Sequence, residues 1–298
     1  MVELGKPAWA EGATLRTVAA WASYPTARRQ ARGLVHATDT FSAVKGSAVV
    51  TVHDLIPMQV SGEPTAWLHR RLYGGRLGKA HLIVPTRHWA GRVAKAFRVP
   101  ADRVHVVPQG CSVRAPARRP PRPAALGNGR SVLCVGAYRR YKRIRDLVLA
   151  AAHLRVRVVR VGPASQGAYA RLCRGEARRV GCDFVDVGAV PDDQLAAYYA
   201  NADLVFYASK DEGFGFPPLE AMACGTTSLV SDIPVFRELY GEHVRYATGP
   251  LRRELRDALV APLPPTALRR HAARFDWDVT ARRTAEVHRI AREERRAS

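Results

Sequence analysis

From residue 48 onward, short runs of β-branched residues alternate with longer segments whose apolar positions recur at the period of a helix. This alternation is typical of repeated β-α units around a parallel sheet, so the sequence predicts an α/β fold. In the first half we expect one helix over Thr65–Lys79, and another from an N-cap at Thr86 to about Phe97. The strands expected beside them are Ser47–Val52, Leu82–Val84 and Arg103–Val107.

A second β-α series fills the C-terminal half and predicts a complete doubly wound domain. Its expected strands are Val132–Val135, Val156–Val161, Asp183–Val187, Leu204–Tyr207 and Thr227–Val230. Its helices are expected to begin near Arg143, Ser165, Asp192, Pro217 and Ile233. The pattern then predicts one long, arginine-rich amphipathic helix over Trp277–Arg296.

Between the two series, residues 112–130 are rich in proline and glycine and have no hydrophobic period, which predicts an inter-domain linker. Residues 1–33 contain no convincing strand, so the first domain is predicted to lack its opening β-α units. We therefore expect an incomplete N-terminal domain over residues 1–111, the linker, a C-terminal domain over 131–276 and a final helix over 277–298.

Charge is the unusual feature of the composition. With 47% hydrophobic and 24% charged residues, the chain is predicted to fold as an ordinary water-soluble protein. Its 47 Lys and Arg residues against 26 Asp and Glu give a net charge of +21, which favours an anionic partner. Nucleic acid, anionic lipid headgroups and phosphorylated substrates all fit, but no nucleic-acid-binding motif accompanies the charge. We expect no specific nucleic-acid partner.

Cysteine usage and the lack of long apolar runs indicate the compartment. The five cysteines form no CxxC pair, which favours buried free thiols in a reducing environment over disulfides or a zinc site. No basic and then apolar leader precedes the first clear strand, and no apolar run approaches the roughly 18 residues of a membrane span. The chain is therefore expected in the cytoplasm.

The densest chemical signal is the run DEGFGFPPLEAMA over residues 211–223, between a predicted strand and a predicted helix. Gly213 and Gly215 let the backbone approach a ligand closely, and Pro217 suits the first turn of a helix. The free N–H groups and the positive dipole end of that turn attract phosphate. Glu212 and Glu220 flank the turn.

A carboxylate beside a phosphate site is costly unless it accepts hydrogen bonds from neutral hydroxyls, which sugars supply. Glu220 is therefore expected to bind a ribose diol, as acidic residues do in dinucleotide folds, and Glu212 to lie near a transferred sugar. In the alternative interpretation, both glutamates only complement the helix dipole and the glycines only form a turn.

The whole stretch resembles the E-x7-E signature of the retaining GT-B glycosyltransferases of family 4, because seven residues separate Glu212 from Glu220 and the flanking sequence agrees. The resemblance implies two Rossmann-like domains whose parallel sheets face each other across a cleft. It also implies that the helix over 277–298 is a C-terminal crossover helix that returns to the first domain. It also implies transfer of a hexose, with retention, from a nucleotide diphosphate sugar. The donor-binding residues that it implies here are Gly213, Phe214, Gly215, Phe216, Pro217, Leu219 and Glu220.

The resemblance continues upstream of the signature. Val135–Lys142 resembles the segment whose lysine contacts the donor diphosphate, which implies donor-binding roles for Gly136 and Lys142. Tyr141 stands where an arginine is common, so Arg139 and Arg140 are expected to substitute for it. Val190 belongs to a segment that resembles the one packing against the nucleotide base. The alternatives are a single charge at a basic helix start for Lys142 and a plain β-turn-α connection around Val190.

In the first half, the segments around His36 and His53 resemble the acceptor-side domain of the same enzymes, and Val104–Gly110 resembles the exit to the linker, with Gln109 where asparagine is common. His53 ends a predicted strand, a frequent place for ligand contacts in open α/β sheets. The resemblance implies that His53 and Glu212 are the catalytic pair, and that His53 faces the sugar from the opposite wall. The alternative is a strand-end histidine bonded to backbone.

We predict neither a metal site nor a bound cofactor, since the nucleotide sugar is itself a substrate. Asp276 and Asp278 match the DxD metal motif of other glycosyltransferases, but they precede or begin a predicted helix and are expected to cap it. Without a metal, Lys142, the neighbouring arginines and the helix terminus near Pro217 must stabilise the departing diphosphate.

The basic first domain suggests a glycan or lipid-linked acceptor and a peripheral position at the inner face of an anionic membrane. A solvated basic face is the alternative. The basic residues are Arg70, Arg71, Arg76, Lys79, Arg87, Arg92, Lys95 and Arg98, interleaved with Trp67, Leu72, Tyr73, Trp89 and Phe97.

The identity of the donor and the catalytic activity of the chain both have alternative interpretations. The sequence around His53 resembles mannosyltransferases, which favours GDP-mannose over UDP-sugars as donor. A catalytically inactive relative that binds or scaffolds is the main alternative function, because the opening β-α units are missing. A basic nucleic-acid-binding protein is the second.

Overall fold

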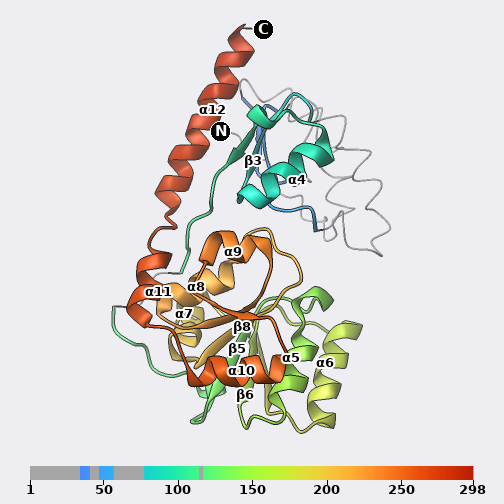
Figure 1. The fold of residues 1–298 in the computed structure, drawn as a ribbon, viewed down its shortest axis with the longest axis vertical. Helices are drawn as coiled ribbons and strands as arrows, with labels where there is room; N and C mark the ends of the chain where they lie inside the picture. Colours follow the sequence, from blue (N-terminus) through green and yellow to red (C-terminus); the bar gives the residue numbers. More distant parts are fainter. Residues whose placement is uncertain (1–33, 41–46, 57–76, 114–116, 298) are drawn as a thin grey trace. The chain divides into compact units, whose positions relative to one another are not determined.

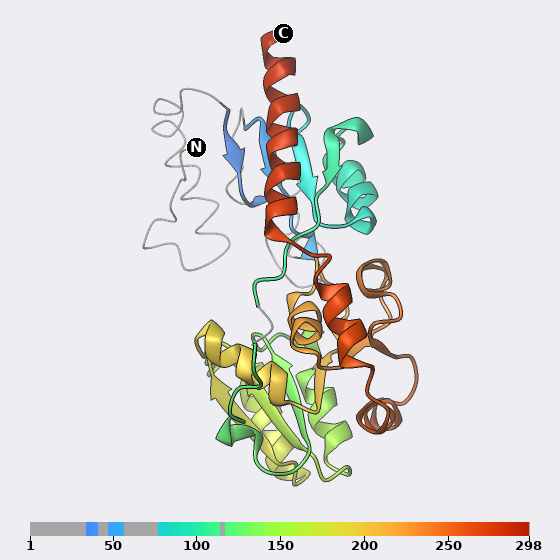
Figure 2. The same ribbon diagram turned by 90° about the vertical axis from the view of Figure 1, so that its left-hand side faces the viewer.

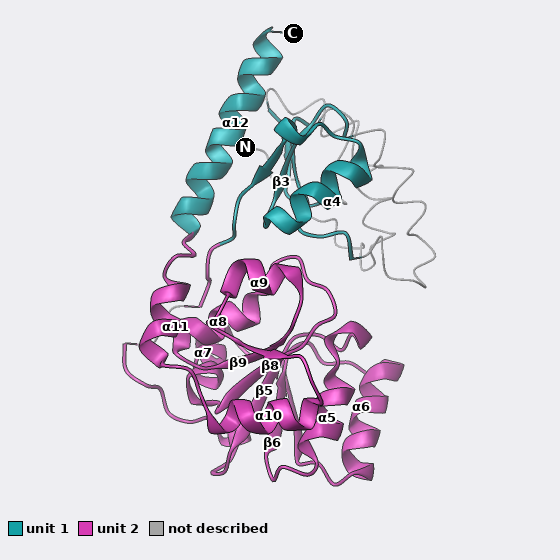
Figure 3. Ribbon diagram, in the orientation of Figure 1, with its two compact units in different colours: residues 1–109, 277–298 teal, residues 110–276 magenta. Residues whose placement is uncertain are grey.

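The computed structural model describes residues 34–40, 47–56, 77–113 and 117–297. The chain divides into two compact units: residues 1–109 with 277–298 form unit 1, and residues 110–276 form unit 2 (Figure 3). Residues 112–130, for which a linker is predicted, belong to unit 2, and the final helix belongs to unit 1.

The described part of unit 1 contains a parallel sheet in the order β1-β2-β3-β4. The strands are β1 (His36–Ala37), β2 (Val49–Thr51), β3 (His81–Val84) and β4 (Val104–Val106), preceded by a short 3-10 turn, η2 (Ala101–Arg103). Helix α4 (Arg87–Phe97) begins after Thr86, whose side chain accepts a hydrogen bond from the Trp89 amide. The expected strands and N-cap in this region are confirmed.

The predicted helix over Thr65–Lys79 lies outside the described residues except for its last part, and Leu77–Ala80 is a turn rather than a helix. Other predictions concern residues that also lie outside the described part of the chain: residues 1–33 and Arg70, Arg71, Arg76, Trp67, Leu72 and Tyr73.

Helix α12 (Trp277–Ala297) lies along the sheet of unit 1 (Figure 2). Val287 and Ala291 on this helix are buried against Val49, Ile83 and Val107. Apolar contacts therefore hold the last helix of the chain against the sheet of unit 1.

Unit 2 is a doubly wound domain around six parallel strands in the order β10-β9-β8-β5-β6-β7 (Figure 1). The strands are β5 (Ser131–Val135), β6 (Arg157–Val161), β7 (Phe184–Gly188), β8 (Leu204–Tyr207), β9 (Ser228–Ser231) and β10 (Arg245–Ala247). The helices are α5 (Ile144–Ala151), α6 (Ala168–Arg179), α7 (Asp192–Asn201), α8 (Phe216–Cys224), α9 (Pro234–Tyr240), α10 (Leu251–Val260) and α11 (Pro265–Ala272), with 3-10 turns η3 (Ala124–Leu126) and η4 (Arg140–Lys142).

Side chains alternate between two cores because successive strand residues point to opposite faces. In β5, Val132 contributes to a core with α5, α6 and α10, whereas Leu133 contributes to a core with α7 and α8. All five predicted strands and all five predicted helices of this unit are present, within about three residues of their expected starts. The sequence analysis did not predict β10, α10 or α11, which are short elements with few buried residues.

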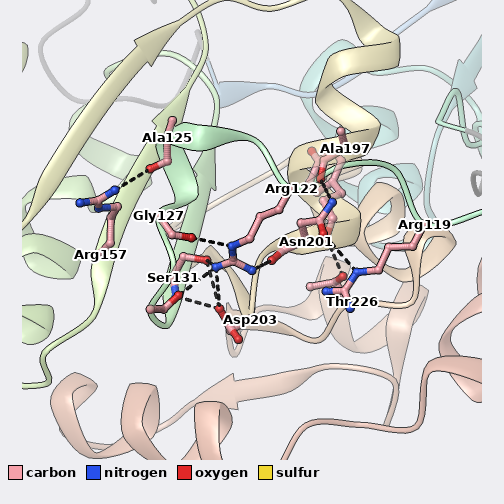
Figure 4. A network of polar contacts seen from close by, with 12 residues as sticks. Arg119, Arg122, Ala125, Gly127, Ser131, Arg157, Ala197, Asn201, Asp203 and Thr226 are labelled. Carbon is pink, nitrogen blue, oxygen red and sulfur yellow. Dashed lines mark hydrogen bonds and ion pairs between the residues drawn. The ribbon is translucent and has the colours of Figure 1, made fainter.

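The segment after residue 116 is fixed to unit 2 by arginines rather than by an apolar face (Figure 4). Arg122 donates to the backbone oxygens of Gly127 at 2.7 Å and Asn201 at 2.6 Å. Arg119 donates to the side-chain oxygen of Asn201 at 3.1 Å, and Leu126 is fully buried in the core. A proline-rich stretch without hydrophobic period is thereby held on unit 2.

In the part of the chain that the structure describes, no helix combines the length and apolar character needed to cross a membrane.

Candidate functional site at the carboxyl edge of unit 2

The sheet of unit 2 reverses its strand order between β5 and β8, which are neighbours although β6 and β7 lie between them in the chain. Ligands of open α/β sheets bind at such a switch point, beyond the carboxyl ends of the strands. The loops that follow β5 and β8 meet there, since the Lys210 amide donates to the Tyr141 carbonyl at 2.9 Å. They carry most of the predicted donor-binding residues.

The loop after β5 is shaped by a glycine and a buried arginine. Gly136 has φ of +132°, a conformation that side chains disfavour. Arg160 on β6 is fully buried, and its guanidinium donates to the Gly136 carbonyl at 2.7 Å and to Asp186 at 2.8 Å. A Cβ atom on Gly162 would lie 2.5 Å from the same carbonyl. These contacts fix the start of the segment that leads to Lys142.

The loop after β8 ends in the N-terminus of α8. Gly215 adopts φ of +90° as the N-cap, and a Cβ atom there would lie 2.5 Å from the Phe236 ring. The Tyr240 hydroxyl donates to the Gly215 carbonyl at 2.6 Å. No side chain caps this helix, whose first turn contains Pro217, so its N-terminal dipole is available to an anion.

Lys142 and Glu212 meet between these loops. The Lys142 ammonium donates to Oε1 of Glu212 at 3.1 Å and to the Tyr207 hydroxyl at 2.7 Å. Only 14% of the Lys142 side chain and 11% of the Glu212 side chain are exposed, so the pair is shielded from bulk water. Burial and the neighbouring Glu212 hold the pKa of Tyr207 well above its usual value, which keeps the phenol protonated.

Glu220 lies within α8 and has a different partner. The Tyr199 hydroxyl donates to its Oε2 at 2.6 Å. Burial raises the pKa of the Glu220 carboxyl, and the bond from Tyr199 partly offsets this. Tyr199 is itself fully buried, and burial followed by the charge of Glu220 holds its pKa well above the usual value. The two glutamates thus occupy separate polar environments.

The other predicted residues differ in exposure. Phe214 is 3% exposed, and its ring packs against Phe216 and Phe275, so its side chain supports the loop from behind. Leu219 is fully buried inside α8. Arg139 and Arg140 are exposed beside Lys142, and Val190 packs against the core around α7. Gly213 is buried in the loop, while Phe216 and Pro217 are half-buried in the first turn of α8.

His53 belongs to unit 1, and both of its ring nitrogens have partners there. Nε2 donates to the Thr38 carbonyl at 3.0 Å, which leaves Nδ1 to accept from the Gln109 amide at 2.9 Å. The ring is exposed. The bond to the Thr38 carbonyl is the backbone bond of the alternative interpretation, and the expected contact of His53 with a sugar stays a prediction.

The described residues contain no group of three or more His, Cys, Asp or Glu side chains that could hold a metal ion. Asp276 immediately precedes α12 and Asp278 lies in its first turn, which is the position expected for residues at a helix start.

Three supporting residues escaped the sequence interpretation: Tyr207, Tyr199 and Arg160. A signal for Arg160 exists, because a charge inside the apolar strand VRVVRV needs a buried partner. Tyr207 ends a strand next to the switch point, which is a weaker signal. Nothing in the sequence pairs Tyr199 with Glu220.

The site thus joins a nearly buried ammonium, an uncapped helix N-terminus and two carboxylates in separate environments. The cationic groups suit an anion such as a diphosphate, and the carboxylates suit neutral hydroxyls. A ligand that carries both phosphate and hydroxyl groups would meet suitable partners here.

Comparison with known proteins agrees with this chemistry. Residues 120–253 match the family model of the glycosyl transferases group 1. The O-antigen chain mannosyltransferase RfbU of Salmonella typhimurium is 38% identical over 90 residues, covering 29% of this chain and 26% of that protein. A D-inositol 3-phosphate glycosyltransferase of Thermobispora bispora is 31% identical over 243 residues, covering 71% of this chain and 56% of that protein. The chain spans from about a quarter to three fifths of the first curated relatives that it matches.

Solved structures share the fold. Sucrose-phosphate synthase from Thermosynechococcus elongatus superimposes with a TM-score of 0.74 at 20% identity, over all of this chain and 82% of that one. Anabaena HepE, in complex with UDP and glucose, gives a TM-score of 0.68 at 21% identity over 92% of this chain and 75% of that one. The family match shows that residues 120–253 belong to the group 1 glycosyltransferases, and the solved structures show that the chain has the GT-B fold.

Proposed function

We propose that this chain transfers a hexose from a nucleotide diphosphate sugar to a hydroxyl group of a glycan or lipid-linked acceptor. The observation that carries the proposal is the contact of Lys142 with Glu212 at 3.1 Å, at the switch point and beside the loop that leads into α8. A diphosphate would bind to the ammonium and the helix terminus, and the sugar hydroxyls would donate to the carboxylate.

Departure of the nucleotide diphosphate is the demanding step, because negative charge develops on its phosphate oxygens. Lys142 and the first turn of α8 are held in place before any ligand binds, and preorganised groups of this kind lower the barrier without reorganising during the reaction. Glu212 would position and stabilise the sugar. We propose retention at the anomeric carbon on the resemblance of the E-x7-E segment.

The donor proposal has two supports of different kinds. HepE binds UDP and glucose in its structure, which is consistent with a nucleotide sugar donor for a chain of the same fold. The similarity to the mannosyltransferase RfbU favours GDP-mannose and a role in polysaccharide biosynthesis. Membrane association and the cytoplasmic location stay predictions.

A thermal-shift panel of GDP-mannose, UDP-glucose, UDP-N-acetylglucosamine and GDP tests the proposal. We expect the true donor to raise the melting temperature of the wild type, because a ligand stabilises the state that it binds. Glu220→Ala should reduce this shift by removing the expected ribose partner. Glu242→Ala is the matched control, since Glu242 is exposed just after α9.

Failure of every nucleotide sugar to stabilise the wild type would overturn the enzyme assignment. Donor binding without turnover of the donor, by hydrolysis or by transfer to a membrane extract, would instead favour the binding or scaffold alternative.

A further inference from the structure

Each glutamate of the site is held by a tyrosine hydroxyl that comes from another element. Tyr207 is the last residue of β8 and is 5% exposed, and its hydroxyl accepts from Lys142 at 2.7 Å. It is also hydrogen-bonded to Glu212. Tyr199 on α7 is fully buried and donates to Glu220 at 2.6 Å. A buried tyrosine hydroxyl is therefore hydrogen-bonded to each of the two carboxylates.

We propose that Tyr207 and Tyr199 are positioning residues that divide the donor site, with Tyr207 serving its diphosphate half and Tyr199 its ribose half. The proposal rests on the function proposed above. It assigns roles to two residues that act through Lys142, Glu212 and Glu220.

Tyr207 helps to fix the direction of the Lys142 ammonium. An ammonium on a flexible four-carbon stem has three donors and no fixed direction of its own. The bonds to Tyr207 and Glu212 engage two of these donors and direct the third. A phenol can accept from the ammonium while it donates to the carboxylate, so Tyr207 satisfies both charged groups at once. Its ring also lies 4.5 Å from the ammonium, which favours the cation at this place.

Tyr199 acts on one oxygen of Glu220. Its hydroxyl engages Oε2, so Oε1 can accept from a ligand hydroxyl. Burial disfavours the ionised carboxyl of Glu220, and a hydrogen bond to the charged form counteracts this effect. Tyr199 therefore favours the ionised form of the carboxylate and orients it, as a ribose diol requires.

Phenylalanine substitutions separate these roles from packing, because they remove one oxygen and retain the ring. We propose to titrate GDP, GMP and GDP-mannose into the full chain by calorimetry, with UDP, UMP and UDP-glucose in parallel. Tyr207→Phe should weaken GDP and GDP-mannose about tenfold and GMP by less than about threefold, since GMP lacks the second phosphate. Tyr199→Phe should weaken all three by a similar factor, because they share the ribose.

The control is Tyr246→Phe. The Tyr246 hydroxyl donates to the Gly241 carbonyl at 2.7 Å, away from both glutamates. This variant should leave every affinity unchanged. The ratio of GDP to GMP affinity is taken within one variant, so a partial loss of folded protein cancels. A purely structural role for Tyr207 would leave this ratio at the wild-type value.

Any of four results would contradict the proposal. An unchanged GDP to GMP ratio in Tyr207→Phe, or a changed ratio in Tyr199→Phe, would overturn the division of the site while the proposed function stands. Unaltered binding in both variants would do the same. If the wild type binds neither the guanosine nor the uridine series, the proposed function itself falls, and this inference falls with it.

Discussion

Two regions of the molecule join distant segments through polar side chains, one by an ion pair and the other by contacts between histidines. At the carboxyl edge of unit 2, Lys142 and Glu212 form a charged pair in a nearly dry setting. Under α12 in unit 1, histidines do the joining: His36 Nδ1 contacts His288 Nε2 at 3.0 Å, and His81 Nδ1 contacts His105 Nε2 at 2.9 Å.

The difference has a physical reason. An ammonium that is paired with one carboxylate keeps a further N–H donor, so Lys142 can still bind an anion such as a diphosphate. Burial lowers the pKa of His36 and of His288, which favours their neutral rings, and two neutral imidazoles can share one hydrogen bond. The first arrangement suits a binding site, whereas the second suits a permanent contact between a helix and a sheet.

The largest effect is expected from breaking the charged pair. Lys142→Ala should lower activity on the order of 1,000-fold, because it removes a diphosphate contact and leaves a buried carboxylate without its cation. Steady-state transfer from the donor identified in the panel measures this. Lys210→Ala, which removes an exposed lysine from the facing loop, should retain activity. Equal losses in the two variants would show that net charge, not the pair, matters.

The next effect concerns the buried arginine behind the site. Arg160→Met should destabilise the fold by about 3 kcal/mol, because Asp186 loses its fully buried partner. It should also weaken donor binding, since the Gly136 carbonyl loses its anchor. Chemical denaturation and calorimetry measure the two effects. Arg178→Met on the exposed surface of α6 is the control, and a stable Arg160→Met protein would mean that Arg174 and Tyr138 satisfy Asp186 alone.

The smallest effect is a pH dependence of the α12 contact. Burial, and then His288, lowers the pKa of His36 from 6.5 to about 4. Between these values the unfolded chain binds a proton that the folded chain excludes, so the stabilisation is complete above about pH 6.5 and is lost as the pH falls toward 4. The protection factors of the α12 amides, which correct for the pH dependence of intrinsic exchange, should therefore fall on acidification.

His36→Gln should make the protection of the α12 amides less dependent on pH, because the titrating ring is absent. His153→Gln replaces an exposed histidine of unit 2 and should leave the dependence unchanged. If the α12 amides have equal protection factors at pH 7 and pH 5 in the wild type, the histidine contact is not what holds the helix.

Much of unit 2 could be predicted because local signals and tertiary environment agree there. The strand Leu204–Tyr207 was located to the residue, since a continuous apolar run suits a strand that is covered on both faces. Helix α8 begins one residue before the predicted Pro217, because its proline and glycine positions mark a first turn unambiguously. The resemblance then supplied the candidate chemistry of Lys142 and Glu212.

Other features could not be predicted, since they depend on contacts between residues far apart in the chain. The proline-rich segment is held by Arg122, whose acceptor at Asn201 lies 79 residues away. A guanidinium bonded to backbone carbonyls leaves no hydrophobic period in the sequence. His53 was predicted from its place at a strand end, but its bond to the Thr38 carbonyl depends on the neighbouring chain segment.

The sequence by itself determined the α/β class, the order of most elements in unit 2 and the charged residues that an anion would meet. These follow from periodicity, turn chemistry and a dense motif, all of which are local. Only the tertiary structure decided that Lys142 pairs with Glu212 and that separate tyrosines hold the two glutamates. These are contacts across the sheet or between distant segments, and their geometry exists only once the strands have assembled.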